Sequence, residues 1–154
     1  MDMTTLLNPK AVRFIASATS KKRLFQTLGD AAQSVYGLEA DAVVSALQER
    51  ETLGPTGVGH GVAVPHARLD EIDKVAGVFF RLDKPLDYGS VDKAPVDLVF
   101  ALFAPRDAGV EHLKALAFIS RTLRNPHVCE KLRANDDAAK IHAILTSGET
   151  SKAA

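Results

Sequence analysis

The sequence has one cysteine, no tryptophan and no excess of charge of either sign among its 154 residues. The single Cys129 can form neither an internal disulfide nor a cysteine zinc site. Two tyrosines and seven phenylalanines leave little with which to build an aromatic stacking platform for bases or sugars. Nineteen basic residues balance nineteen acidic ones, whereas a domain that binds nucleic acid normally shows a basic surplus. These absences disfavour a nucleic-acid-binding role.

Membrane insertion and secretion are disfavoured as well. No apolar run approaches the roughly 20 residues that a helix needs to span a bilayer. The first residues, MDMTTLLNPKAVR, lack the apolar segment that follows a basic start in a signal peptide. A lone cysteine also suits a reducing compartment. We therefore expect a cytoplasmic protein.

The composition that remains, 46% hydrophobic and 25% charged, is typical of a soluble globular protein. A chain of this length has room for one core, and we expect one domain over residues 1–147. The last residues, 148–154, are polar and are expected to form a disordered tail.

The expected elements are helices, then strands, then helices. Apolar residues at helical spacing predict helices from about Ser20 to Tyr36 and from about Glu39 to Glu51. The cations in the first turn of the earlier helix are expected to be solvated: Lys21, Lys22 and Arg23. Two apolar runs, VAGVFFRL (75–82) and VDLVFALF (96–103), predict strands that are buried on both faces.

The last third of the chain predicts three helices. The first runs from near Gly109 to Asn125, and its buried face is expected to carry Leu113, Leu116, Ala117, Ser120 and Leu123. Asn125 is placed to cap a short helix that has Pro126 at its first position. Asn135 and Asp136 are placed to cap the last one. A mixed β-sheet with helices packed on it accounts best for this order of elements.

A glycine-rich stretch between the early helices and the strands carries the first candidate for chemistry. Residues 54–61 hold four glycines and cannot be a regular helix. Pro65 favours an extended Val64, so residues 62–64 predict a short strand that ends at a rigid corner occupied by His66. Arg68, two residues on, would point the same way, lower the imidazole pKa and attract an anion. The other interpretation is an ordinary loop histidine that is hydrogen-bonded to a backbone carbonyl.

Two more residues are candidates, although each has a simpler explanation when it is taken alone. His112 lies near a helix start, where free N–H groups favour an anion, but it is expected to be an exposed first-turn residue. Arg50 lies at a helix end, where a cation is stabilising whatever else it does.

A zinc site formed by His60, His66 and His112 is also conceivable, since three histidines suffice for a catalytic metal. No H-x-x-x-H spacing supports it. The candidates are instead surrounded in the sequence by five cations, which would repel a metal and attract a phosphate: Arg50, Arg68, Lys74, Arg106 and Lys114.

Three separated segments, in the same order, resemble one protein family. The segment GVGHGVAVPHAR (57–68) resembles the phosphorylation-site signature of phosphotransferase-system enzyme IIA proteins of the fructose/mannitol class, and within it the nitrogen-regulatory type. LQERET (47–52) and PRDAGVEHLKAL (105–116) match the helix end and the second-histidine segment of that family. Two positions depart from the family pattern, because His60 stands where a small or amide residue is common and Ala67 where glycine is common.

The resemblance implies a single α/β domain whose mixed sheet is flanked by helices on both faces. It implies that His66 accepts a phosphoryl group from an HPr-type carrier, and that His112 and Arg50 stabilise it. Arg68 is a weaker addition, from its spacing, and Gly59 and Gly61 are expected to bind the phosphate or the partner. No metal or cofactor is implied.

The partners implied after phosphorylation are regulatory targets, such as potassium-transport or signalling proteins. The sequence leaves an alternative open, a sugar-specific enzyme IIA that passes phosphate to a IIB protein. A module that binds without transferring phosphate is a third possibility, disfavoured by the presence of His66, His112 and Arg50.

Overall fold

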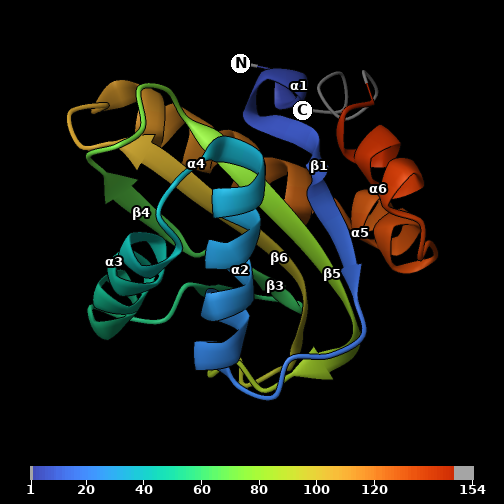
Figure 1. Ribbon diagram of the computed structural model, residues 1–154. Coiled ribbons are helices and arrows are strands. Elements are labelled where there is room, and N and C mark those ends of the chain that lie inside the picture. Colours follow the sequence, from blue (N-terminus) through green and yellow to red (C-terminus); the bar gives the residue numbers. More distant parts are fainter. Residues whose placement is uncertain (1, 148–154) are drawn as a thin grey trace.

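The computed structural model describes residues 2–147. Within them, six strands form one mixed sheet in the order β1-β5-β6-β3-β2, with β4 also paired to β6 (Figure 1). The expected α/β fold with a mixed sheet is confirmed. The tail expected over 148–154 lies outside the described residues. No helix within residues 2–147 is long and apolar enough to cross a membrane.

The centre of the sheet is formed by β5 (Ala76–Leu86) and β6 (Val96–Pro105), which are antiparallel to each other. These are the two strands that the apolar runs predict, and their residues 76–80 and 98–104 are all buried, as expected. Leu86 still pairs with Val96, so β5 extends beyond the end of its apolar run at Leu82. Burial on both faces requires helices on both sides of the sheet.

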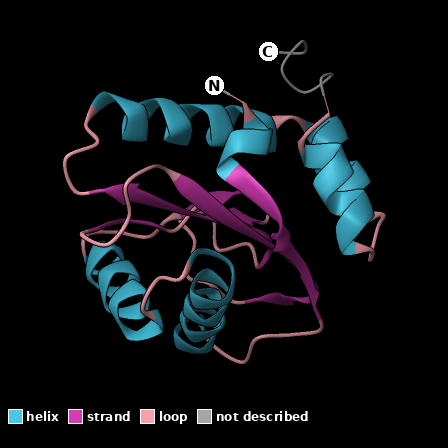
Figure 2. Cartoon of the chain, turned by 45° about the horizontal axis from the view of Figure 1, so that its top comes forward, coloured by secondary structure: helices cyan, strands magenta, loops and turns pink. Residues whose placement is uncertain are grey.

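The helices do cover both faces (Figure 2). On one face lie α2 (Lys21–Tyr36) and α3 (Ala40–Thr52), which pack on each other and contact the sheet through β1, β4 and β5. The other face carries α4 (Val110–Arg124), α5 (Pro126–Arg133) and α6 (Ala138–Leu145). Predicted and observed helix limits agree to within two residues where both ends were predicted, because caps and breakers mark them. Ser20 caps α2, and Asn125 caps α5 with Pro126 at its first position.

One strand was missed altogether. The chain begins with a short helix, α1 (Met3–Leu6), followed by β1 (Leu7–Ile15), which pairs parallel to β5 at the sheet edge. The predicted order of helices, strands and helices is therefore wrong at its start. Residues 8–10 of β1 are exposed and include Pro9, so the strand has no regular alternation that a sequence pattern could reveal.

The predicted buried face of α4 is also wrong. Of the five residues expected on it only Leu123 is buried, and Leu113 is 63% exposed. The helix instead turns His112, Ala115, Ile119 and Leu123 inward. The last helix is capped by Asp137, whose side chain accepts from the amide of Ala139, rather than by Asn135 or Asp136.

The glycine-rich stretch forms two short strands, β2 (Gly57–Gly59) and β3 (Val62–Ala63), and leads into β4 (His66–Leu69). Both β3 and β4 run parallel to β6, with Val62 opposite Leu98 and His66 opposite Leu102. They form one line along β6 that is interrupted at Val64 and Pro65, because proline has no N–H for a ladder. The rigid corner that the sequence predicts is therefore wrong: β4 keeps the register of β3 along β6, and His66 lies at the start of β4.

Gly57 is needed for close packing, because a Cβ atom there would overlap the Ser90 side chain. We expect Gly57→Ala to lower the free energy of unfolding by about 1–3 kcal/mol, as overpacking does. Urea unfolding followed by circular dichroism measures this, with exposed Val58→Ala as the control. The Ser90 hydroxyl is buried and has no hydrogen-bond partner among the residues that the structure describes. Adding Ser90→Gly should restore most of the loss, and a double variant as unstable as Gly57→Ala would contradict this explanation.

Candidate active site

His66 is held by a hydrogen bond to each ring nitrogen. Its Nδ1 lies 2.9 Å from the carbonyl oxygen of Val64, and its Nε2 lies 3.3 Å from Nε of Arg50. A carbonyl can only accept and an arginine N–H can only donate. The hydrogen therefore sits on Nδ1, and the lone pair of Nε2 faces Arg50. The backbone carbonyl of Val64 thus selects the tautomer and leaves the lone pair of Nε2 available to act as a nucleophile.

Arg50 reaches His66 from the last turn of α3. Its Nη1 donates to the carbonyl oxygen of Gly54 at 3.1 Å, just beyond the helix. The guanidinium is therefore anchored at one nitrogen while another contacts the imidazole. The helix-end position expected for Arg50 is confirmed, and the structure adds the contact with His66.

His112 lies beside His66 and is not the exposed residue expected from its position in the first turn of α4. It is only 5% exposed, and the centroids of the two imidazoles are 5.7 Å apart. Its Nδ1 is buried without a hydrogen-bond partner in the described part of the chain. Its neighbours Val110, Glu111 and Leu113 are exposed, so His112 is the residue of this turn that faces inward.

Burial favours the neutral form of both imidazoles by lowering their pKa. It lowers the pKa of His66; the hydrogen bond to Val64 opposes this, and the charge of Arg50 lowers the pKa further. Burial together with the charge of Arg68 and the presence of His66 lowers the pKa of His112 to about 4. Arg68 was expected to lower the pKa of His66. Its charge instead lowers the pKa of His112, and it is the charge of Arg50 that lowers the pKa of His66.

These residues line one cavity of about 350 Å³: Ala46, Glu49, Arg50, Leu53, His66, Ala67, Arg68, Arg106 and His112. Three guanidinium groups and one carboxylate make its lining strongly positive. Arg68 and His66 both point away from the buried side of β4, as residues two apart in an extended strand should. Lys74 and Lys114 are absent from this lining. A concave cationic site with two neutral imidazoles suits a phosphoryl group and gives no reason to expect a metal.

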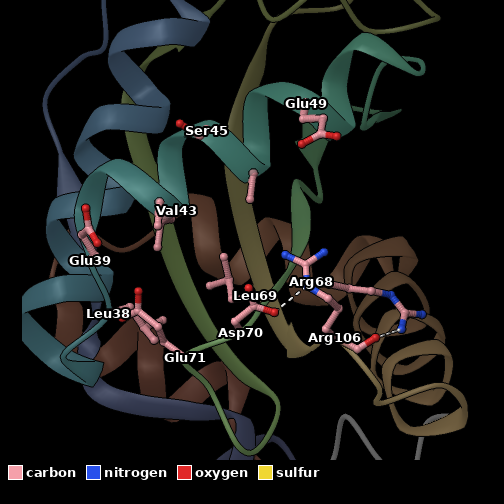
Figure 3. Close-up of a pocket in the computed structure, with 12 residues that line it drawn as sticks. Leu38, Glu39, Val43, Ser45, Glu49, Arg68, Leu69, Asp70, Glu71 and Arg106 are labelled. Carbon is pink, nitrogen blue, oxygen red and sulfur yellow. Dashed lines mark hydrogen bonds and ion pairs between the residues drawn. The ribbon is translucent and has the colours of Figure 1, made fainter.

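Arg68 and Arg106 also border a second, smaller cavity between α3 and β4, of about 220 Å³ (Figure 3). Arg68 donates to the carbonyl oxygen of Arg106 at 2.9 Å, and Arg106 pairs with Asp70 at 2.6 Å. The other ionisable residues around it are acidic: Glu39, Glu49 and Glu71. Arg106 was named in the sequence only as a nearby cation, and its place in the site comes from the end of β6 lying beside β4.

Gly59 and Gly61 are not brought to this cavity. They flank His60 in the turn between β2 and β3, and all three have positive φ angles. Gly59 and His60 instead line a separate cavity of about 540 Å³ beside α5. These glycines therefore serve the turn, where left-handed backbone is required. The zinc site is also contradicted for His60, and no metal-binding cluster occurs among the described residues.

The family model described as "Phosphoenolpyruvate-dependent sugar phosphotransferase system, EIIA 2" matches residues 5–148. The chain belongs to this family. It is 46% identical over 145 residues to a nitrogen regulatory protein of Bradyrhizobium diazoefficiens, covering 94% of this chain and 95% of that protein. It is 33% identical over 150 residues to a nitrogen regulatory protein of Escherichia coli K12, covering 97% and 92%.

Solved structures agree with this family placement. The crystal structure of nitrogen regulatory protein IIA-Ntr from Neisseria meningitidis has a TM-score of 0.85 and 32% identity, over 94% of this chain and 99% of that one. The mannitol IIA of E. coli, at 22% identity and a TM-score of 0.73, shares the fold. The resemblance to the nitrogen-regulatory branch of enzyme IIA is confirmed.

The buried His112 predicts a pH dependence of stability. Its folded-state pKa of about 4 lies below its unfolded value near 6.5, so the unfolded chain takes up the proton first as pH falls. The stability that this neutral group contributes is full above about pH 6.5 and is lost as pH falls toward 4. Urea unfolding across this range should show a smaller pH slope in His112→Gln than in the wild-type enzyme IIA. Equal slopes would contradict the assignment of a buried neutral imidazole.

Proposed function

We propose that this enzyme IIA is a phosphocarrier in which His66 accepts a phosphoryl group from a phosphohistidine on an HPr-type protein. The observation that carries the proposal is the pairing of Nδ1–H with Val64, which leaves the lone pair of Nε2 in a cationic cavity. A neutral imidazole is required for attack, and burial favours that form by lowering the pKa of His66. The membership of the enzyme IIA family supports the same chemistry.

The transfer exchanges one P–N bond for another. The Nε2 lone pair attacks phosphorus while the donor's P–N bond breaks and its electron pair returns to the donor imidazole. The N–H of Arg50 that lies at Nε2 in the free protein must turn to a phosphate oxygen as the new bond forms. Positive charge that develops on the His66 ring is stabilised by the Val64 carbonyl at Nδ1.

The remaining groups of the cavity would stabilise the phosphate. A phosphohistidine brings negative charge into a site lined by Arg50, Arg68 and Arg106. His112 lies close enough to offer a neutral N–H, and the incoming charge should raise its pKa. Positioning and positive electrostatics, rather than covalent chemistry by the protein, supply most of the catalysis of such transfers.

The regulatory output is proposed from the relatives, which are named nitrogen regulatory proteins. The two phosphorylation states would differ in charge at one concave surface and so bind target proteins differently. Proteins of potassium transport or signalling are the proposed targets.

The test of the proposed transfer is intact mass after incubation with phosphoenolpyruvate, enzyme I and an HPr-type carrier. We expect one acid-labile phosphoryl group per chain. No phosphate on this protein, with carriers that phosphorylate a known acceptor, would overturn the proposal for those carriers.

A sugar-transport role is the second candidate, because a fructose-specific EIIA component of Haloferax volcanii is 35% identical over 107 residues. Incubation of the phosphorylated protein with fructose-type and mannitol-type IIB proteins distinguishes the two. Rapid loss of phosphate to a IIB protein would favour sugar transport, and retention would favour the regulatory role.

A further inference from the structure

Glu51 follows Arg50 at the end of α3, but its side chain contacts Lys21 and Thr56 and does not line the cavity of His66. Its carboxylate side chain is only 9% exposed and lies 2.8 Å from the Nζ of Lys21, which comes from the first turn of α2. The same Nζ lies 4.2 Å above the ring of Tyr88. Lys21 is therefore no solvated first-turn cation, as the sequence suggested, but half of a partly buried ion pair that joins two helices.

The carboxylate also holds Thr56, which is buried. Glu51 accepts from the Thr56 amide at 3.0 Å and from its hydroxyl, and the Tyr88 hydroxyl lies 3.3 Å from the same carboxylate. Burial by itself would raise the pKa of Glu51, but the bonds from Lys21 and Thr56 outweigh it and the pKa lies below its ordinary value. The Glu51 carboxylate is thus ionised and accepts hydrogen bonds from Lys21 and Thr56.

The hydrogen bonds continue from Thr56 to the nucleophile. The carbonyl oxygen of Thr56 accepts from the amide of Val64 at 2.9 Å, and the carbonyl oxygen of Val64 accepts from Nδ1 of His66 at 2.9 Å. Two hydrogen bonds to backbone carbonyls therefore connect Thr56, which Glu51 binds, to the imidazole of His66. The link passes through the segment between β3 and β4, where the bond from Val64 to Thr56 continues the antiparallel pairing of β2 with β3.

We propose that Glu51 is a positioning residue that sets the tautomer and the orientation of the His66 imidazole. Neighbouring residues of one helix turn then control the two ring nitrogens: Arg50 contacts Nε2 directly, and Glu51 fixes Nδ1 through Thr56 and Val64. The inference deepens the proposed function, but its structural part, the state of the imidazole, does not depend on phosphoryl transfer.

The experiment compares Glu51→Gln and Lys21→Met with the wild type by two readouts. The first is the tautomer and pKa of His66, from nitrogen chemical shifts of the ¹⁵N-labelled imidazole over a pH titration. The second is the rate of phosphorylation by an HPr-type carrier. Asp97→Asn is the matched control, because Asp97 pairs with Arg133 in another partly buried ion pair, which links the start of β6 to α5.

We expect the wild type to show only the Nδ1–H tautomer. Glu51→Gln should add the Nε2–H tautomer and slow phosphorylation by about tenfold or more, as misplacement of a reacting group does. Because the charge of Glu51 raises the pKa of His66, its removal should also move that pKa lower. Lys21→Met should act in the same direction with a smaller effect, and Asp97→Asn should leave the tautomer unchanged.

Two results would overturn the inference. One is a single Nδ1–H tautomer in both Glu51→Gln and Lys21→Met. The other is an equal tautomer change in Asp97→Asn, which would mark a general loosening of the fold. If Glu51→Gln does not fold, the same readouts on Lys21→Met decide. If the wild type takes up no phosphate, the proposed function fails, while the tautomer comparison still supports or overturns the role of Glu51.

Discussion

His66→Ala is expected to abolish phosphorylation, because no other ring nitrogen has the same arrangement. Only His66 combines an Nδ1 held by a carbonyl with an Nε2 that faces an arginine among residues 2–147. His112 lies in the same cavity, but within residues 2–147 its Nδ1 has no hydrogen-bond partner to select a tautomer. Intact mass after incubation with an HPr-type carrier measures the result, and acid lability identifies a phosphohistidine.

His60→Ala is the matched control for this experiment. The sequence places His60 in the same glycine-rich segment, yet the structure places it in a separate cavity with Arg133. We expect His60→Ala to take up phosphate at the wild-type rate. Full phosphorylation of His66→Ala, or its loss in His60→Ala alone, would contradict the assignment of the nucleophile.

Arg50→Met is expected to slow phosphorylation by about 10²–10³-fold, the usual cost of removing a donor aimed at developing charge. Arg50 is anchored at Gly54 and already contacts the attacking nitrogen, so no other cation of the cavity can replace its geometry. Arg50→Lys should recover little, because an ammonium cannot bond Gly54 and the phosphate in the same fixed fork.

The rate should be measured by rapid quench, with exposed Arg121→Met on α4 as the control for loss of one positive charge. The control should phosphorylate at nearly the wild-type rate. A reduction of less than about threefold in Arg50→Met would show that the cationic lining works only as a diffuse field, in which a single charge counts for little.

Much of the fold could be predicted because local signals are strong where burial is complete. The cores of β5 and β6 are continuous apolar runs, and Ser20 and Asn125 begin helices with side-chain caps. The edge strand β1 was missed because it gains its stability from pairing with β5, a contact distant in sequence. The buried face of α4 was assigned wrongly because Leu113 is apolar yet exposed beside the site.

The site was predictable from motifs but not from single residues. His112 and Arg50 each had a plausible structural explanation, and only the packing of α3 and α4 around β4 brings them to His66. Gly59 and Gly61 lie outside the cavity of His66, and the sequence could not show this because a glycine needed for a turn and a glycine near a phosphate look alike in sequence. The network around Glu51 joins residues 21, 51, 56 and 88, and no spacing in the chain predicts it.

The most direct test of the central claim is the position of the phosphate on the imidazole of His66. Two-dimensional ¹H–¹⁵N spectra of the phosphorylated, histidine-labelled protein distinguish the two ring nitrogens through their coupling to phosphorus. The account predicts phosphate on Nε2 and a hydrogen retained on Nδ1, where Val64 holds it. Phosphate on Nδ1 of His66, or on another histidine, would contradict it.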